Sequence, residues 1–299
     1  MTWNVYFNHS FFNREKKSIQ NFKIEKKIGN GTFGPIYEIK IRIGHEKRAL
    51  QIIEKELIKD NFMQDNFRDP TNEELDNYIN NIFINKIDYM IDTINKEDKN
   101  NNSVKYYEYF EMNDQLRIVM ELCDDNLLNY LEQRKNPLNS REISIFLKQL
   151  NNVFIIMEKN HLIHGSLNLE NILIKYENVE KTKYKVKLKL SKNSIIMEED
   201  PSNVKYQNIE DNLNFIAPEL FNGGNYNKKC DLWSLGIIIY FLYFKKYPYN
   251  LEKDINQINN KLDIKTDSPE LDDLIKRLLV KNQGQRMNWK EYFNHPFFK

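Results

Sequence analysis

The residues with the clearest chemical potential lie in the stretch 161–174, where a histidine, a hydroxyl and an amide follow one another closely. His164, Ser166 and Asn171 occupy this stretch, with Gly165 between the first two. A serine hydroxyl has no useful basicity near neutral pH, so Ser166 cannot take a proton from a substrate. Asn171 offers a single amide oxygen, which holds Mg²⁺ poorly without a carboxylate beside it. The stretch therefore has closely spaced polar groups, but Ser166 cannot serve as a base in it.

A glycine-rich stretch nearer the N-terminus is suited to lie against phosphate groups. Gly29, Gly31 and Gly34 let the backbone approach a ligand closely, because no side chain intervenes. Alternating apolar residues at 22–28 and 36–41 predict strands on both sides. The same glycine spacing also arises in ordinary hairpin turns, and that interpretation stays open.

The elements that must position these residues follow from hydrophobic periodicity. Further strands are predicted over 48–53, 104–110 and 116–123, with a helix at 78–87. The polar run 95–103 is expected to be a solvated insertion.

Two helices are predicted in the second half of the chain. The apolar run Leu235–Phe244 is too short to span a bilayer and is expected to be a buried helix. Residues 143–159 form an amphipathic pattern. Its apolar positions are Ile145, Phe146, Leu150, Val153, Phe154 and Met157.

Several motifs together resemble the eukaryotic protein kinase family, from about Phe22 to the C-terminus. The final segment, 289–298, reads Trp-x-x-Tyr-Phe-Asn-His-Pro-Phe-Phe and is similar to that of the autophagy-initiation kinase branch. The matching residues are Gly29, Gly31, Gly34 and Ile36 of the Gly-rich loop, His164, Leu167 and Asn171 of the catalytic loop, Ala217, Pro218 and Glu219 of the A-P-E motif, Asp231, Trp233, Ser234 and Gly236 at the start of the central helix, and Arg286.

This resemblance implies an α+β, bilobal protein kinase-like fold. Its β-rich N-lobe with helix C would cover residues 19–121, and its mainly helical C-lobe residues 122–299. Four residues would hold the fold rather than act in catalysis: His164, Asp231 under the catalytic loop, and Glu219 paired with Arg286.

The positions that carry phosphoryl transfer in the family are degenerate in this chain. Gln51 stands at the lysine of the third strand and Asn81 at the helix-C glutamate, although Glu73 or Glu74 could be the true partner position. Gly165 and Ser166 replace the catalytic-loop Arg and Asp. Residues 186–193 occupy the D-F-G region, with Leu190 as the degenerate position. No alignment of this stretch with the D-F-G motif supplies an Asp. Because no catalytic residue is intact, the resemblance implies a pseudokinase.

Three functions stay open on this basis. The first is a non-catalytic scaffold or allosteric regulator that binds a protein partner, expected to be another kinase or kinase-like domain. The second is a pseudokinase that holds ATP weakly and without Mg²⁺, with Lys189 or Lys192 replacing the lost charge. The third is a weakly active kinase with relocated groups. No cofactor is required and no metal is expected. The nucleotide-site positions would be Gly29, Gly31, Gly34, Ile36, Ala49, Met120, Glu121, Cys123 and Asn171.

Composition narrows the possible partners. The chain has 44 Lys and Arg residues against 43 Asp and Glu residues, so its net charge is +1. This charge creates no overall electrostatic field that would attract nucleic acid or an anionic membrane. The two cysteines, Cys123 and Cys230, are far apart and read as reduced thiols of a cytoplasmic protein.

The chain also contains an internal repeat. Residues 1–12 match residues 287–298 at eight of twelve positions, including Trp, Tyr and His. One interpretation is that residues 1–18 are the tail of a preceding kinase-like domain in a tandem array. The alternative is a short duplication that forms an aromatic arm, able to self-associate through residues 1–12.

Overall fold

The computed structural model divides the chain into two compact units. The first unit contains Met1–Leu75 and Tyr106–Leu122, and the second contains Asp76–Lys105 and Cys123–Lys299. The sequence division at 121/122 thus falls one residue from a unit boundary, but residues 76–105 group with the second unit. The structure describes residues 22–31, 34–66, 68–80, 84–189, 195–196, 213–221, 227–250, 257–258 and 261–299.

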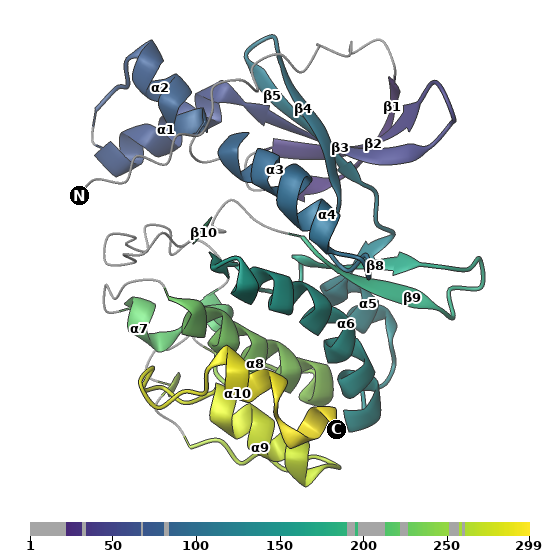
Figure 1. Ribbon diagram of the computed structural model, residues 1–299, viewed down its shortest axis with the longest axis vertical. Coiled ribbons are helices and arrows are strands. Elements are labelled where there is room, and N and C mark those ends of the chain that lie inside the picture. The colour runs from purple at the N-terminus through teal and green to yellow at the C-terminus, as the bar shows by residue number, and fades with distance from the viewer. Residues whose placement is uncertain are drawn as a thin grey trace. The chain divides into compact units, whose positions relative to one another are not determined.

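The first unit is built on an antiparallel sheet of five strands in the order β1-β2-β3-β5-β4 (Figure 1). Ile39, Leu50, Ile52 and Val119 form its buried apolar cluster. The strands predicted from alternating patterns are confirmed. Their bounds are β1 Phe22–Gly31, β2 Gly34–Ile41, β3 Lys47–Glu54, β4 Tyr106–Met112 and β5 Gln115–Glu121.

The connection after β3 is helical. Helix α1 (Lys55–Asn66) follows the strand directly and buries Ile58 and Phe62, and α2 (Asn72–Ile79) comes next. Helix α3 begins at Asn85. The predicted helix at 78–87 therefore overlaps the end of α2 and the start of α3, and Asn81 lies outside the described residues.

The second unit is mainly helical. Its helical elements are α3 Asn85–Tyr89, the π-helix Met90–Ile94, α4 Asn95–Glu97, α5 Leu127–Gln133, α6 Ser140–Lys159, the 3₁₀ turn η6 Leu213–Phe215, α7 Pro218–Phe221, α8 Lys228–Phe244, α9 Pro269–Leu278, α10 Trp289–Phe293 and the 3₁₀ turn η8 Pro296–Phe298. Its strands are β6 Asp125–Asn126, β7 Leu162–Ile163, β8 Ile172–Tyr176, β9 Tyr184–Leu188 and β10 Ile195–Ile196. None of the helices among the described residues is long and apolar enough to cross a membrane.

Helix α6 confirms the amphipathic pattern predicted for 143–159, with one exception. A reciprocal capping box between Asn139 and Glu142 starts the helix at Ser140. Phe146, Leu150 and the other predicted apolar positions are buried, but Ile145 is 55% exposed. Ile145 was expected on the apolar face, and this was wrong because the neighbouring Phe146 already takes the core-facing direction.

Helix α8 is the buried apolar helix expected around 235–244. It is almost fully buried along its length, and Asn227 caps its first turn through Lys229 N. A Cβ atom on Gly236 would lie 2.8–2.9 Å from the side chains of Leu279 and Leu278. Gly236 therefore permits the close approach between α8 and the end of α9.

The polar run 95–103 is not the solvated insertion that its composition suggested. Asp98, Asn102 and Ser103 are buried. Ser103 donates to the Asp98 carboxylate from its backbone N (2.5 Å) and its hydroxyl (2.7 Å). The Asn102 amide donates to Val186 O (2.7 Å) and accepts from Asn152 (2.9 Å). Long-range hydrogen bonds, which composition does not reveal, bury part of this run, whereas Lys96, Lys99 and Asn100 are exposed.

The same run is joined to strand β9. The fully buried ammonium of Lys187 donates to Asn101 Oδ1 (2.9 Å), and Val104 N donates to Leu188 O (2.9 Å). Strand β4 consequently begins at Tyr106 instead of Val104, because the preceding backbone is already bonded to β9.

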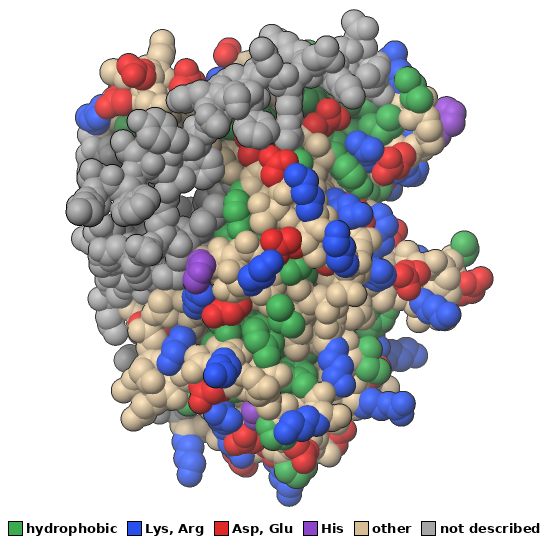
Figure 2. Space-filling view, viewed as in Figure 1, with side chains coloured by type: hydrophobic (Ala, Val, Ile, Leu, Met, Phe, Trp, Pro, Cys, Tyr) green, Lys and Arg blue, Asp and Glu red, His purple; other side chains and the backbone are tan. Residues whose placement is uncertain are grey.

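Acidic and basic side chains are interspersed over the face of the molecule in Figure 2. This distribution agrees with the net charge of +1 and leaves no large field of one sign on the described part of that face.

We expect Asn102→Ala to lower the free energy of unfolding by about 1–3 kcal/mol, because it removes two buried hydrogen bonds and leaves their partners unsatisfied. Urea unfolding midpoints measure the loss. The exposed neighbour Asn100 provides the control, and Asn100→Ala should change stability by less than about 0.5 kcal/mol. Equal effects of the two substitutions would contradict the buried network.

Candidate functional site

The loop containing His164, Ser166 and Asn171 lies between β7 and β8 and is held by helix α8. The Asp231 carboxylate, in the first turn of α8, accepts from His164 N (2.7 Å) and Gly165 N (2.9 Å). Gly165 has a φ of 71°, a left-handed conformation that favours glycine. Asp231 thus fixes the backbone at the start of the loop. Burial raises the pKa of Asp231 to about 6, although the two N–H donors act in the opposite direction.

His164 is fully buried, and its two ring nitrogens have different partners. Nδ1 accepts from Ser166 N (3.3 Å), and Nε2 lies 3.0 Å from Lys189 O. Both contacts are satisfied by the neutral tautomer with its hydrogen on Nε2. Protonation would place a second hydrogen against the N–H of Ser166. Burial lowers the pKa of His164 to about 4, against the hydrogen bond to Lys189.

The rest of the loop is held by two asparagines. The Asn171 amide donates to Ser166 O (2.8 Å) and lies 3.4 Å from Ser166 Oγ. Asn168 Oδ1 accepts from Glu170 N (3.0 Å) and Asn171 N (2.9 Å). Asn171 therefore bonds the loop backbone through its side chain. No group of three or more His, Cys, Asp or Glu side chains in the described part of the chain is arranged to hold a metal ion.

Lys189 closes the site on the β9 side. Its backbone N donates to Asn171 O (2.9 Å) and its carbonyl faces His164. Burial lowers the pKa of the half-buried Lys189 ammonium, while Cys123 and Glu170 act to raise it. Leu190, the predicted degenerate position of the D-F-G region, lies outside the described residues.

The glycine-rich stretch forms the β1–β2 hairpin of the first unit. Gly31 pairs with Gly34, Gly29 pairs with Ile36, and Ile36 pairs with Gln51 of β3. A Cβ atom on Gly31 would lie 2.6 Å from Gln51 Nε2. The Gln51 amide therefore packs directly against the glycine backbone.

The remaining predicted nucleotide-site residues lie on neighbouring strands or in the other unit. Ala49 of β3 pairs with Met120 of β5, and both are buried. Glu121 ends β5 and is buried, whereas Cys123 is half-buried and belongs to the second unit.

Glu73 and Glu74 were the alternatives to Asn81 as the partner position of Gln51, and Glu74 has its partners close by in the sequence. The Glu74 carboxylate accepts from both terminal nitrogens of Arg68 and from Thr71 N. Arg68 lowers the pKa of Glu74 to about 2. Glu73 is exposed.

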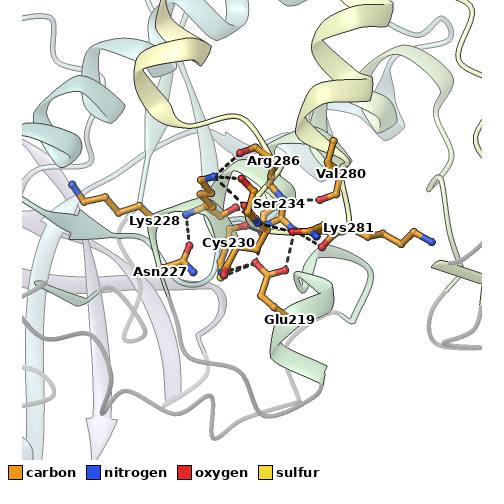
Figure 3. Close-up of polar contacts among 12 residues, drawn as sticks. Glu219, Asn227, Lys228, Cys230, Ser234, Val280, Lys281 and Arg286 are labelled. Atoms are coloured by element: carbon orange, nitrogen blue, oxygen red, sulfur yellow. Dashed lines mark hydrogen bonds and ion pairs between the residues drawn. The ribbon is translucent and has the colours of Figure 1, made fainter.

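Glu219 and Arg286 form the ion pair that the sequence suggested (Figure 3). Nη1 and Nη2 of Arg286 each donate to one carboxylate oxygen of Glu219 at 2.8 Å. The Arg286 side chain is fully buried and Glu219 is 14% exposed. Arg286 also donates to Val280 O (3.0 Å) and Lys229 O (2.8 Å).

The surroundings of this pair complete its hydrogen bonding. Cys230 Sγ (3.4 Å) and Gln283 Nε2 (3.2 Å) donate to Glu219 Oε1. The Arg286 guanidinium lies 5.1 Å from the centre of a Trp233 ring. Burial opposes ionisation of Glu219, but Arg286 outweighs it and the pKa of Glu219 lies below its usual value.

Comparison with known proteins identifies the family. The protein kinase domain family matches residues 22–298. The chain belongs to the protein kinase family. Its α+β fold is accordingly the bilobal protein kinase fold, as the motifs predicted.

Two Aurora kinases resemble this kinase domain. The Saccharomyces cerevisiae Aurora kinase is 26% identical, with 94% of this chain and 70% of the relative covered. The Candida glabrata Aurora kinase is 25% identical, with 94% and 72% covered. The serine/threonine-protein kinase PLK4 of Drosophila virilis is 20% identical, with 94% of this chain but 33% of the relative covered. The chain thus spans about a third of that relative's length.

Within the second unit, the structure brings His164, Gly165, Ser166, Asn171 and Asp231 of the kinase domain together around one loop. The roles of Asn168 and Lys189 in that loop were not predicted from the sequence. Asparagine is a common turn residue because its side chain can bond the backbone two or three residues ahead. Asn168, two residues before Glu170, could therefore have been predicted to form a turn in this loop. The bonds of Lys189 are long-range and left no signal.

We expect Arg286→Ala to cost about 3–5 kcal/mol of unfolding free energy, because it leaves the Glu219 carboxylate largely buried without its cation. Urea midpoints measure it. Arg277 provides a control, since its pair with Glu291 is about 40% exposed on both sides and Arg277→Ala should cost less than about 1 kcal/mol. A loss below 1 kcal/mol for Arg286→Ala would contradict a structural role for the pair.

We expect His164 to make the kinase domain sensitive to acid. The imidazole has an ordinary pKa of 6.5 and a folded-state pKa of about 4. Because the unfolded chain takes up the proton first, stability that is present above pH 6.5 is lost as the pH falls toward 4. Linkage gives a loss of about 2 kcal/mol between pH 7 and pH 5.

The measurement compares unfolding free energies at the two pH values for the natural chain, His164→Gln and His161→Gln. His161 is exposed, so its variant should follow the natural chain. Asp231 acts in the opposite direction, because a raised carboxyl pKa loses stability as the pH rises toward 6. The test therefore rests on the difference between variants. Parallel pH dependence of all three proteins would contradict the neutral buried imidazole.

Proposed function

We propose that this kinase domain does not transfer phosphate and acts by binding a protein partner, namely another kinase or kinase-like domain. The observation that carries the proposal is Ser166 at the position of the catalytic base, within an otherwise ordered loop. Active kinases place an Asp there to accept the proton of the substrate hydroxyl. The Ser166 hydroxyl lies beside the Asn171 amide at 3.4 Å, a neutral donor that confers no basicity on it.

Gln51 supports the same proposal from the first unit. Kinases use a lysine at this strand position to hold the α- and β-phosphates. Here a neutral amide packs against Gly31 and provides no positive charge. The chain therefore has no positive charge for the nucleotide at this strand position and no base for the substrate at position 166.

Weak ATP binding without Mg²⁺ is a second candidate function, favoured by Lys189. Its half-buried ammonium has a pKa lowered by burial, so an anionic group beside it would stabilise the charged form. The formed β1–β2 hairpin with its three glycines is compatible with this function. Residual kinase activity would in addition require a carboxylate at a relocated position.

We expect no transfer of radiolabelled γ-phosphate to the chain itself or to generic protein substrates. Ser166→Asp should recover little, because catalytic groups act as a unit and Gln51 would remain. Transfer clearly above background by the natural chain that disappears in Ser166→Ala would sink the proposal of inactivity.

Calorimetry with ATP, in MgCl₂ and in EDTA, separates the two candidate functions. Weak binding that is equal in both buffers supports the nucleotide-binding function, and no binding supports the partner-binding function alone. Tight binding that requires Mg²⁺ would contradict both.

The proposed partner class is tested by cross-linking the chain in its own cells and identifying the linked chains by mass spectrometry. Arg286→Ala serves as the destabilised control. The relevant chains are those that are cross-linked to the natural protein but not to Arg286→Ala. If none of them contains a kinase domain, the proposed partner class is contradicted.

A further inference from the structure

Residues 287–298 dock into a site on the second unit through one set of side chains. Met287, Trp289, Tyr292 and His295 are buried. The segment forms α10 and η8, and Figure 1 shows α10 beside α8 and α9. The other side chains of the segment are half-buried or exposed.

Three of the buried side chains each make a polar contact with a different helix. Trp289 Nε1 donates to Lys228 O of α8 (3.1 Å). Tyr292 Oη donates to Asn151 Oδ1 of α6 (2.9 Å).

The third contact joins His295 Nε2 to Asp273 Oδ2 of α9, at 3.0 Å. The Trp289 ring also packs on Phe154 of α6, with 5.0 Å between ring centres. We call Asn151, Phe154, Lys228 and Asp273 the α10 site.

The repeat at residues 1–12 keeps the side chains that fill this site and changes those that do not. Seven positions of 287–298 are buried or half-buried, and all seven have the same residue in the repeat. Of the five exposed positions only one is the same. The seven repeated residues are Met1, Trp3, Tyr6, Phe7, His9, Phe11 and Phe12, and the four changed ones are Thr2, Asn4, Val5 and Ser10.

This distribution indicates that residues 1–12 and residues 287–298 are suited to bind the same site. A segment related to 287–298 only by composition would not match at all seven contacting positions and differ at four of five exposed ones. Residues 1–12 retain the indole, phenol and imidazole groups that would meet Lys228 O, Asn151 and Asp273.

We propose that residues 1–12 of one copy of this chain bind the α10 site of a second copy, in place of residues 287–298. Exchange of equivalent elements is a low-cost route to dimers. Neither segment contains a catalytic-loop residue, so the interaction is independent of the proposed inactivity.

The resident segment has two advantages over its copy. It is covalently tethered next to the site, which gives it a high effective concentration. It also begins with a capping box between Asn288 and Glu291, whereas the copy has Thr2 and Val5 there. Residues 1–12 should therefore bind the α10 site of a second copy strongly only when the contacts of residues 287–298 with that site are weakened.

The first test weakens the resident segment in the full chain by His295→Ala. Sedimentation should give a dimer at least tenfold tighter than that of the natural chain. Lys290→Ala, at an exposed position of the same segment, should match the natural chain. Adding Trp3→Ala and Tyr6→Ala to His295→Ala should abolish the dimer. Melting curves check that each variant is folded.

A second test uses a fluorescent peptide of residues 1–13 and measures its anisotropy with each protein. Binding to the natural chain should be at least tenfold weaker than to His295→Ala. A peptide with Trp3→Ala and Tyr6→Ala should lose at least tenfold in affinity, whereas Asn4→Ala with Val5→Ala should not. Two outcomes would overturn the proposal: a folded His295→Ala chain that stays monomeric at every concentration, or peptide binding that is indifferent to Trp3 and Tyr6.

Discussion

The buried guanidinium of Arg286 is the group on which the second unit depends most. It bonds the A-P-E carboxylate of Glu219, the backbone of α8 at Lys229 and the backbone after α9 at Val280, and it lies against Trp233. Glu219 and Lys229 are 67 and 57 residues from Arg286 in the sequence and meet around its charge. A fully buried cation of this kind is tolerated because its N–H groups donate to Glu219, Lys229 O and Val280 O and its charge is balanced by the Glu219 carboxylate. The helices around it are therefore fixed relative to one another by a polar constraint inside an apolar core.

The polar groups that bond the loop backbone differ from Ser166 and Gln51 at the positions proposed to be degenerate. Asp231, His164 and Asn171 still bond the loop backbone, and each would leave a buried partner unsatisfied if removed. Ser166 and Gln51, the proposed replacements for the catalytic Asp and the strand lysine, are both neutral, so neither brings a buried charge that needs a partner.

The fold was predictable where the determinants are local. Alternation gave the strands of the first unit, and the period of apolar residues gave α6, because both patterns depend on neighbouring residues. The Glu219–Arg286 pair was predictable only through a family resemblance, since 67 residues separate its members. The burial of 95–103 and the late start of β4 were not predictable, because both result from bonds to β9 that are made more than eighty residues away. Of the candidate site, the loop geometry around His164 followed from the motif, whereas Asn81, Leu190 and residues 1–12 lie outside the described part of the chain.

The neutral imidazole of His164 has one more consequence. Its Nε2 hydrogen is enclosed by protein and directed at Lys189 O, so it can exchange with water only when the loop opens. Such a hydrogen should give a persistent, isolated signal in the proton NMR spectrum. The lifetime of that signal would report how often the loop between β7 and β8 separates from β9. The group that makes the loop rigid is thus also a natural spectroscopic probe of its motion, and it requires no label and no ligand.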